Sequence, residues 1–156
     1  PIEQFDGEWK RIDECNEGEM WADVGIEPNL LTKLKVSQRV EKVRRVRSAN
    51  GCEVVCTDGE SFMTNRTDYR GTFLKHLRVG DPVLTKIDGR VIQSKIAEIS
   101  EYIGEEIVYT PSLSNSKLFI GGEWKPSWWQ RLISRVRTGR KVRGGLVLHN
   151  RKAVVE

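Results

Sequence analysis

The chain has 156 residues, of which 38% are hydrophobic, and this length suits one packed domain better than two. Its 26 Lys and Arg residues nearly balance 22 Asp and Glu residues, so the net charge of +4 is weak evidence for a polyanionic partner. No apolar run is long enough to cross a bilayer, and the chain does not open with a cationic stretch followed by an apolar one. These features exclude a membrane-spanning class, and we expect a soluble, cytoplasmic monomer that does not bind membranes.

The first thirty residues are acidic and contain the turn dipeptide Asp6-Gly7. Similar dipeptides recur along the chain between short runs rich in Val, Ile and Thr, namely Asn50-Gly51, Asp58-Gly59, Asp88-Gly89 and Gly121-Gly122. Such pairs adopt the positive φ values that two-residue hairpin loops require. The sequence therefore predicts a mainly β domain of short antiparallel strands.

The first clear hairpin joins residues 43–46 to residues 54–55 through a turn at Asn50-Gly51. Val36, Val40, Val43 and Val46 also fit one face of a helix, so the periodicity alone leaves both structures open. We predict a strand for the second half of this stretch, because the strand after Asn50-Gly51 requires a partner.

A second hairpin is predicted from residues 82–87 through Asp88-Gly89 to residues 90–92. Residues 94–99 alternate polar and apolar side chains, as a half-buried strand does. Residues 106–110 and 117–120 are two further strand candidates.

Residues 123–143 interrupt this β pattern, and we interpret them as an insertion. Ser127 can cap a short helix whose apolar side carries Trp128, Trp129, Leu132, Ile133 and Val136. Seven Lys or Arg residues and no acidic residue lie between Lys125 and Arg143. These cations could bind nucleic-acid phosphates while the Trp rings stack on bases, or they could form a solvated face while the Trp rings seal the β core. A membrane-surface helix is the weakest alternative.

Three cysteines, Cys15, Cys52 and Cys56, form no pattern typical of a zinc site. We expect free thiols in a reducing compartment, and neither a metal nor a cofactor. Cys56 is expected to be buried and unreactive.

The segment from Gly144 to Asn150 ends an apolar strand with His149-Asn150. An asparagine amide can attack its own backbone carbonyl, closing a succinimide and cutting the next peptide bond. A histidine beside it can transfer the required proton near neutral pH. The alternative is a solvated His-Asn pair that does no chemistry.

Other segments add a family resemblance to this motif. The segments are Ile2 to Met20, with Asp6-Gly7, Ile12 and Gly18-Glu19; Gly51 to Thr64; Gly71-Thr72-Phe73 with His76 to Val83; and Val108-Tyr109 with Leu118 to Gly122. In this order they resemble the motifs of inteins and bacterial intein-like domains, the hedgehog-intein (Hint) family. The third segment carries a Leu-x-x-Gly-Asp-x-Val signature. The resemblance implies a compact, horseshoe-shaped, all-β fold in which residues 1–150 form one domain and residues 151–156 a C-terminal flank.

In that family the domain excises itself in cis from flanking host-protein segments. Carried over, Asn150 would cyclise, His149 would transfer its proton, and Thr57 would hold the N-terminal scissile peptide. Glu60 takes the place of the histidine in the family's Thr-x-x-His element, and an ordinary carboxylate cannot donate a proton at neutral pH. His76, the other histidine, is expected to have a surface or packing role.

Two departures from the family point to cleavage in place of splicing. The chain as given opens at Pro1, inside the first motif, without the family's N-terminal nucleophile. Arg151 follows Asn150 where splicing requires a Cys, Ser or Thr. We therefore expect single-turnover cleavage of the 150–151 bond. A non-catalytic Hint-like scaffold that binds nucleic acid through residues 125–143 and an unrelated small β-barrel remain alternatives.

Overall fold

The computed structural model describes residues 1–23, 25, 27–64, 71–114, 118–125 and 142–149. The strands in these residues are β1 Ile2–Glu3, β2 Trp9–Lys10, β3 Met20–Trp21, β4 Asn29–Ser48, β5 Cys52–Cys56, β6 Ser61–Phe62, β7 Thr72–Phe73, β8 Pro82–Ile87, β9 Arg90–Ile99, β10 Gly104–Leu113, β11 Leu118–Gly121, β12 Glu123–Trp124 and β13 Gly144–His149. Two single turns of 3-10 helix complete the described elements, η1 Ile12–Glu14 and η2 Leu74–His76. The fold is all-β, as predicted.

Both predicted hairpins are confirmed. β4 and β5 pair antiparallel around a turn in which Gly51 has φ 96°. β8 and β9 pair from Pro82 with Lys95 to Ile87 with Arg90, and the turn residues Asp88 and Gly89 have φ values of 50° and 76°. Two consecutive positive φ values define the turn that matches the twist of a two-residue hairpin.

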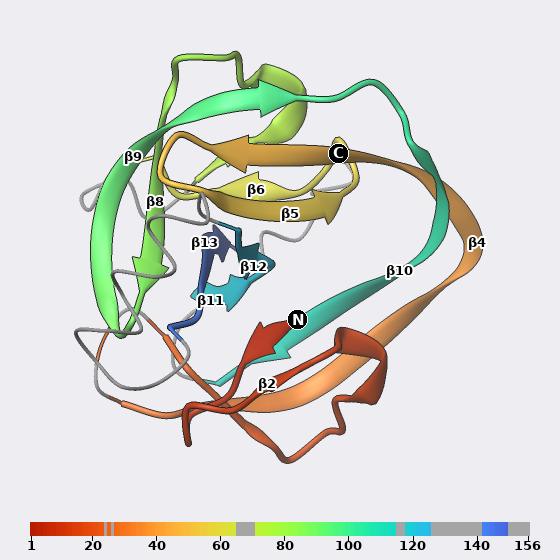
Figure 1. Ribbon diagram of the computed structural model, residues 1–156. Helices are drawn as coiled ribbons and strands as arrows, with labels where there is room; N and C mark the ends of the chain where they lie inside the picture. Colours follow the sequence, from red (N-terminus) through yellow and green to blue (C-terminus); the bar gives the residue numbers. More distant parts are fainter. Residues whose placement is uncertain (24, 26, 65–70, 115–117, 126–141, 150–156) are drawn as a thin grey trace.

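The valine repeat that fits a helix lies instead in β4, a single strand of 20 residues. Its middle part pairs with β10, where Val40 is opposite Ile107 and Val36 is opposite Tyr109. Its start pairs with β3 and its end with β5 and β9. Figure 1 shows β4 and β10 curving together around one side of the molecule. This long, bent strand gives the fold its horseshoe shape.

The remaining strands are arranged on both sides of a central strand, β13. The sheet order is β12-β5-β4-β9-β8-β13-β11-β1-β2, so its two ends stay open. β13 pairs with β8 on one side and β11 on the other, and its last two residues also pair with β6. In Figure 1, β11 and β13 lie between the β8–β9 pair and the β4–β10 pair. The C-terminal motif therefore sits in the middle of the domain.

The core follows the alternation of strand side chains. Leu146 and Leu148 pack into the larger apolar cluster with Trp21 and Phe62, whereas Val147 packs into a smaller cluster with Met63. All three cysteines are buried free thiols.

The expected insertion begins within the sheet, because Glu123 and Trp124 form β12 and pair with β5. The Trp124 indole Nε1 donates a hydrogen bond to the Asn50 carbonyl (2.9 Å). The predicted helix and all but two of the seven cations of residues 125–143 lie outside the described residues, as do Asn150 and the 151–156 flank. No helix in the described ranges is long and apolar enough to span a membrane.

Candidate functional site

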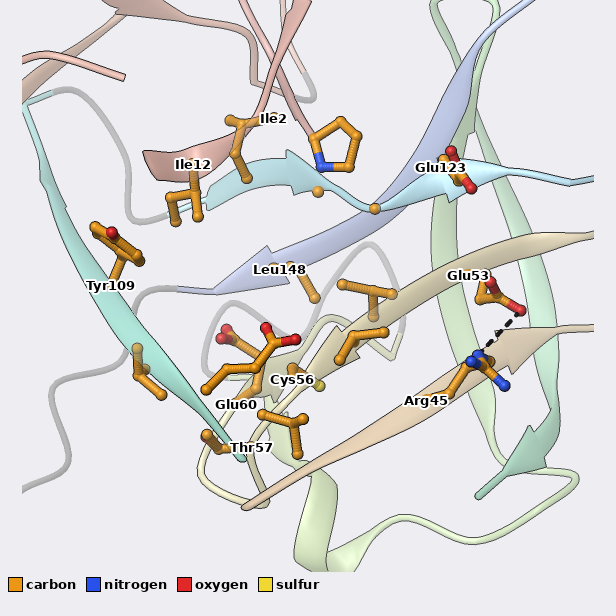
Figure 2. A pocket seen from close by; sticks show the side chains of 18 of the residues that line it. Ile2, Ile12, Arg45, Glu53, Cys56, Thr57, Glu60, Tyr109, Glu123 and Leu148 are labelled. Atoms are coloured by element: carbon orange, nitrogen blue, oxygen red, sulfur yellow. Dashed lines mark ion pairs between the residues drawn. The ribbon is translucent and has the colours of Figure 1, made fainter. Parts of the chain in front are cut away.

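A cavity of about 380 Å³ opens where the N-terminal strand, the turn after β5, β10 and the end of β13 meet. Figure 2 shows Ile2, Tyr109 and Leu148 around it, with Thr57 and Glu60 beside one another. Ile2, the Thr57–Glu60 turn, Tyr109 and Leu148 are far apart in the sequence, and the fold brings them together. Thr57 and Glu60, both predicted as site residues, therefore lie together in the wall of one cavity.

Main-chain hydrogen bonds fix the turn that carries them. The Glu60 N–H donates to the Thr57 carbonyl (3.1 Å), which closes the turn. The next bonds tie it to η2: the Leu74 N–H donates to the Glu60 carbonyl (2.8 Å), and the Lys75 N–H donates to the Asp58 carbonyl (3.2 Å). The turn is thus held both at its base and from outside.

Glu60 is half-buried and lines the cavity. Desolvation raises the pKa of Glu60 from its ordinary value near 4.5 to about 7, and the Ser61 backbone N–H offsets part of this rise. A carboxyl with this pKa is about half protonated at neutral pH. Glu60 therefore meets the condition under which a carboxyl can replace a histidine as a proton donor.

This raised pKa has a consequence for stability. Between pH 4.5 and 7 the folded protein holds the Glu60 proton more tightly than the unfolded chain does, so stability falls as pH rises. We expect the free energy of unfolding to fall by up to about 3 kcal/mol over this range. Glu60→Gln should remove this part of the pH dependence. Urea unfolding of both proteins at a series of pH values measures it, and a parent-minus-variant difference that does not change with pH would contradict the prediction.

His149 is the last residue of β13 and is buried. Its backbone lies next to the turn that carries Thr57 and Glu60. It pairs in register with Leu118 of β11 and with Ser61, the residue after Glu60. Because strand side chains alternate, the His149 side chain faces away from the cavity that Leu148 lines. A Cβ on Gly71 would lie 3.3 Å from the His149 Cβ, which places His149 against Gly71. The structure therefore brings the His149 backbone, but not its imidazole, to the cavity of Thr57 and Glu60.

Cys56 and His76 lie where the non-catalytic roles expected of them would place them. Cys56 is buried in the cavity wall, and burial raises the pKa of its thiol well above the usual range. A thiol in this state is a poor nucleophile. His76 is exposed at the end of η2. Asn150, the predicted cyclising residue, lies outside the described residues.

A group of charges at the cavity edge, Arg45, Glu53, Glu123 and Lys125, was not predicted from the sequence; we call it the charged rim. The Lys125 ammonium lies 3.0 Å from both the Glu53 and the Glu123 carboxylates. The Arg45 guanidinium lies 3.8 Å from Glu53, whose side chain is 12% exposed. Lys125, the first cation of the basic segment, is thus engaged within the domain. Nucleic-acid binding by residues 125–143 stays a prediction, since most of that segment lies outside the described residues.

Comparison with known proteins places this geometry in a fold class. No family model and no curated protein matches the chain. Among solved structures, a variant of the Ssp DnaB mini-intein superposes with a TM-score of 0.69 at 13% identity, covering 96% of this chain and 89% of that one. A bacterial intein-like domain from Clostridium thermocellum gives 0.65 at 14% identity, covering 96% and 93%. The gp41-1 intein gives 0.60 at 18% identity, covering 76% and 86%.

These similarities extend over most of both chains in each pair. They show that the protein has the Hint fold of inteins and bacterial intein-like domains, as the order of its motifs predicted.

Proposed function

We propose that this domain processes itself and that it cuts the peptide bond between Asn150 and Arg151. The Asn150 side-chain nitrogen attacks the Asn150 backbone carbonyl carbon and closes a five-membered succinimide. The bond from that carbon to the Arg151 nitrogen breaks, and the proton lost by the attacking nitrogen is balanced by the one gained by the departing amine. No oxidant, metal or cofactor enters this balance.

The observation that carries the proposal is the place of β13. Its last residue, His149, is bound on both sides, to β11 and to β6, so the peptide that follows leaves from a fixed point beside the Thr57–Glu60 turn. Fixing the reacting groups in one orientation is a large part of the barrier reduction that a self-processing domain can supply. His149 is next to the bond to be cut, and imidazole can transfer a proton near neutral pH.

Thr57 and Glu60 support a second role at the other end of the domain. They share a cavity wall with Ile2 of the N-terminal strand. With a pKa of about 7, Glu60 can supply a proton to a peptide nitrogen that enters the cavity. The Thr57 hydroxyl can hold such a peptide by a hydrogen bond.

Cleavage without ligation is the expected outcome. Arg151 carries no hydroxyl or thiol, so it cannot accept an acyl group from an upstream flank. The partners of the reaction are the flanking segments in cis, and each molecule reacts once.

Intact-mass spectrometry of the purified protein near neutral pH tests this proposal. We expect progressive loss of the six residues Arg151 to Glu156, leaving Asn150 as a succinimide or its hydrolysis product. Asn150→Ala should abolish the loss, because alanine has no attacking amide. His149→Ala should slow it about 10²-fold or more, as expected when a proton-transfer group is removed.

Asn150→Ala reports any cleavage by a contaminating protease, since such cleavage would persist in it. An unchanged mass in the parent, measured also with longer flanks on both sides, would overturn the proposal and leave the non-catalytic scaffold as the better interpretation.

A further inference from the structure

Asp58 lies between Thr57 and Gly59 in the turn that carries Thr57 and Glu60. Two side chains from other strands and loops bind its carboxylate. The Arg44 Nε donates a hydrogen bond to one carboxylate oxygen (2.9 Å), and the Tyr102 hydroxyl donates to the other. Both hydrogen bonds lower the pKa of Asp58, which stays ionised. We call Arg44, Asp58 and Tyr102 the turn clamp.

The clamp is itself anchored. Arg44 lies on β4, opposite Cys56 of β5, and its Nη1 donates to the Ser100 carbonyl (3.1 Å). Its guanidinium carbon lies 3.9 Å from the centre of the Tyr102 ring, a stacking geometry that favours a planar cation. The loop that carries Tyr102 is bound to β4 by the Ile103 N–H, which donates to the Val43 carbonyl (2.9 Å). Side chains from β4 and from the loop before β10 thus meet on the Asp58 carboxylate.

The exposure of the clamp limits what it adds to the stability of the domain. Arg44 and Asp58 have side chains 27% and 34% exposed, and an ion pair this exposed adds little to the stability of the whole domain. Asp58 is nevertheless held through its side chain by the clamp and through its carbonyl by Lys75. Thr57 and Glu60, the two residues of this turn that line the cavity, lie on either side of Asp58.

We infer that the turn clamp is a positioning device that keeps the Glu60 carboxyl pressed into the cavity wall and away from bulk water. This inference rests on the proposed role of Glu60 as a proton donor. When the clamp is loosened, water reaches Glu60, its charged form is stabilised, and its proton is lost at a lower pH.

Other titratable groups near the cavity could also change the pKa of Glu60, so their contribution has to be distinguished from that of the turn clamp. Cys56, Glu106, Tyr109 and the charged rim share the cavity lining with Glu60. Cys56 stays neutral, and the Lys125 charge is paired with both Glu53 and Glu123. Besides Glu60, Glu106 is the carboxylate in the lining that lies outside the charged rim, so Glu106→Gln is a necessary control.

The test is a carbon-13 NMR titration of the Glu60 side-chain carboxyl, which needs no cleavage and so is independent of the proposed reaction. In the parent we expect a midpoint near 7. Tyr102→Phe removes one hydroxyl and keeps the ring under Arg44, and it should lower the midpoint by about one pH unit, reducing the protonated fraction at pH 7 about fivefold. Arg44→Lys removes the planar donor and should act in the same direction.

Lys42→Met is the matched control, because the Lys42 ammonium lies 5.3 Å from the same Tyr102 ring without holding Asp58. It and Glu106→Gln should leave the midpoint unchanged. A midpoint in Tyr102→Phe and Arg44→Lys equal to that of a folded parent would overturn the inference, and so would a parent midpoint at the ordinary value. Failure of the proposed cleavage would appear only in the mass measurement.

Discussion

Lys86→Met should lower the free energy of unfolding by about 3–5 kcal/mol. Lys86 is 7% exposed, and its ammonium donates to the Glu3 carboxylate (3.0 Å) and to the Asp23 carbonyl (2.9 Å). Methionine fills a similar volume but leaves the Glu3 charge, 13% exposed, without its cation in a poorly solvated place. Urea unfolding with linear extrapolation measures the loss.

The matched control is Lys10→Met, which removes a cation from a partly exposed pair with Glu19, whose side chains are 42% and 21% exposed. That change should cost about 0–1 kcal/mol. Adding Glu3→Gln to Lys86→Met should recover part of the loss, because no charge is then left unpaired. If Lys86→Met costs no more than Lys10→Met, the buried pair is not the attachment of β1 to β8 that the structure indicates.

Gly122→Ala should destabilise the protein by about 2–5 kcal/mol, the sum of backbone strain and steric overlap. Gly122 has φ +95°, a region that side chains rarely adopt. A Cβ there would overlap the Glu53 carbonyl oxygen and lie 3.0 Å from the carbonyl carbon. Since β12 pairs with β5 immediately afterwards, the clash cannot be relieved without moving the charged rim.

Gly80→Ala separates the two causes, because Gly80 has the same φ of +95° and no heavy atom within 4 Å of a Cβ. It should cost only the strain, about 1–2 kcal/mol. Thermal and urea unfolding of both variants compare them directly. Equal losses at the two positions would show that the approach to Glu53 is not tight.

Local sequence signals predicted the hairpins well. Asn50-Gly51 and Asp88-Gly89 lie at turns with positive φ, which few other residues allow, so the dipeptide and the structure are linked by sterics alone. The valines of β4 were ambiguous, because the choice of strand depends on pairing with β10, over sixty residues away. Local periodicity carries no information about such a partner.

In the candidate site, too, some features could be predicted from local sequence and others depend on distant parts of the chain. The order of motifs predicted Thr57 and Glu60 as site residues, and the fold places both in the lining of one cavity. The raised pKa of Glu60 could not be predicted, since it depends on desolvation by segments brought together only in the folded chain. The side to which the His149 imidazole turns likewise depends on the register of β13 against β6, and the partner of Lys86 lies 83 residues away.

The position of β13 also sets an order of events during synthesis. It is the last strand of the described chain, yet it fills the centre of the sheet, between β8 and β11. A nascent chain whose residues 144–149 are still in the ribosomal exit tunnel lacks the strand that pairs with both β8 and β11. The cavity wall at Leu148 does not exist until translation has passed this point. The proposed cleavage after β13 therefore requires that this strand has left the ribosome and paired with β8 and β11.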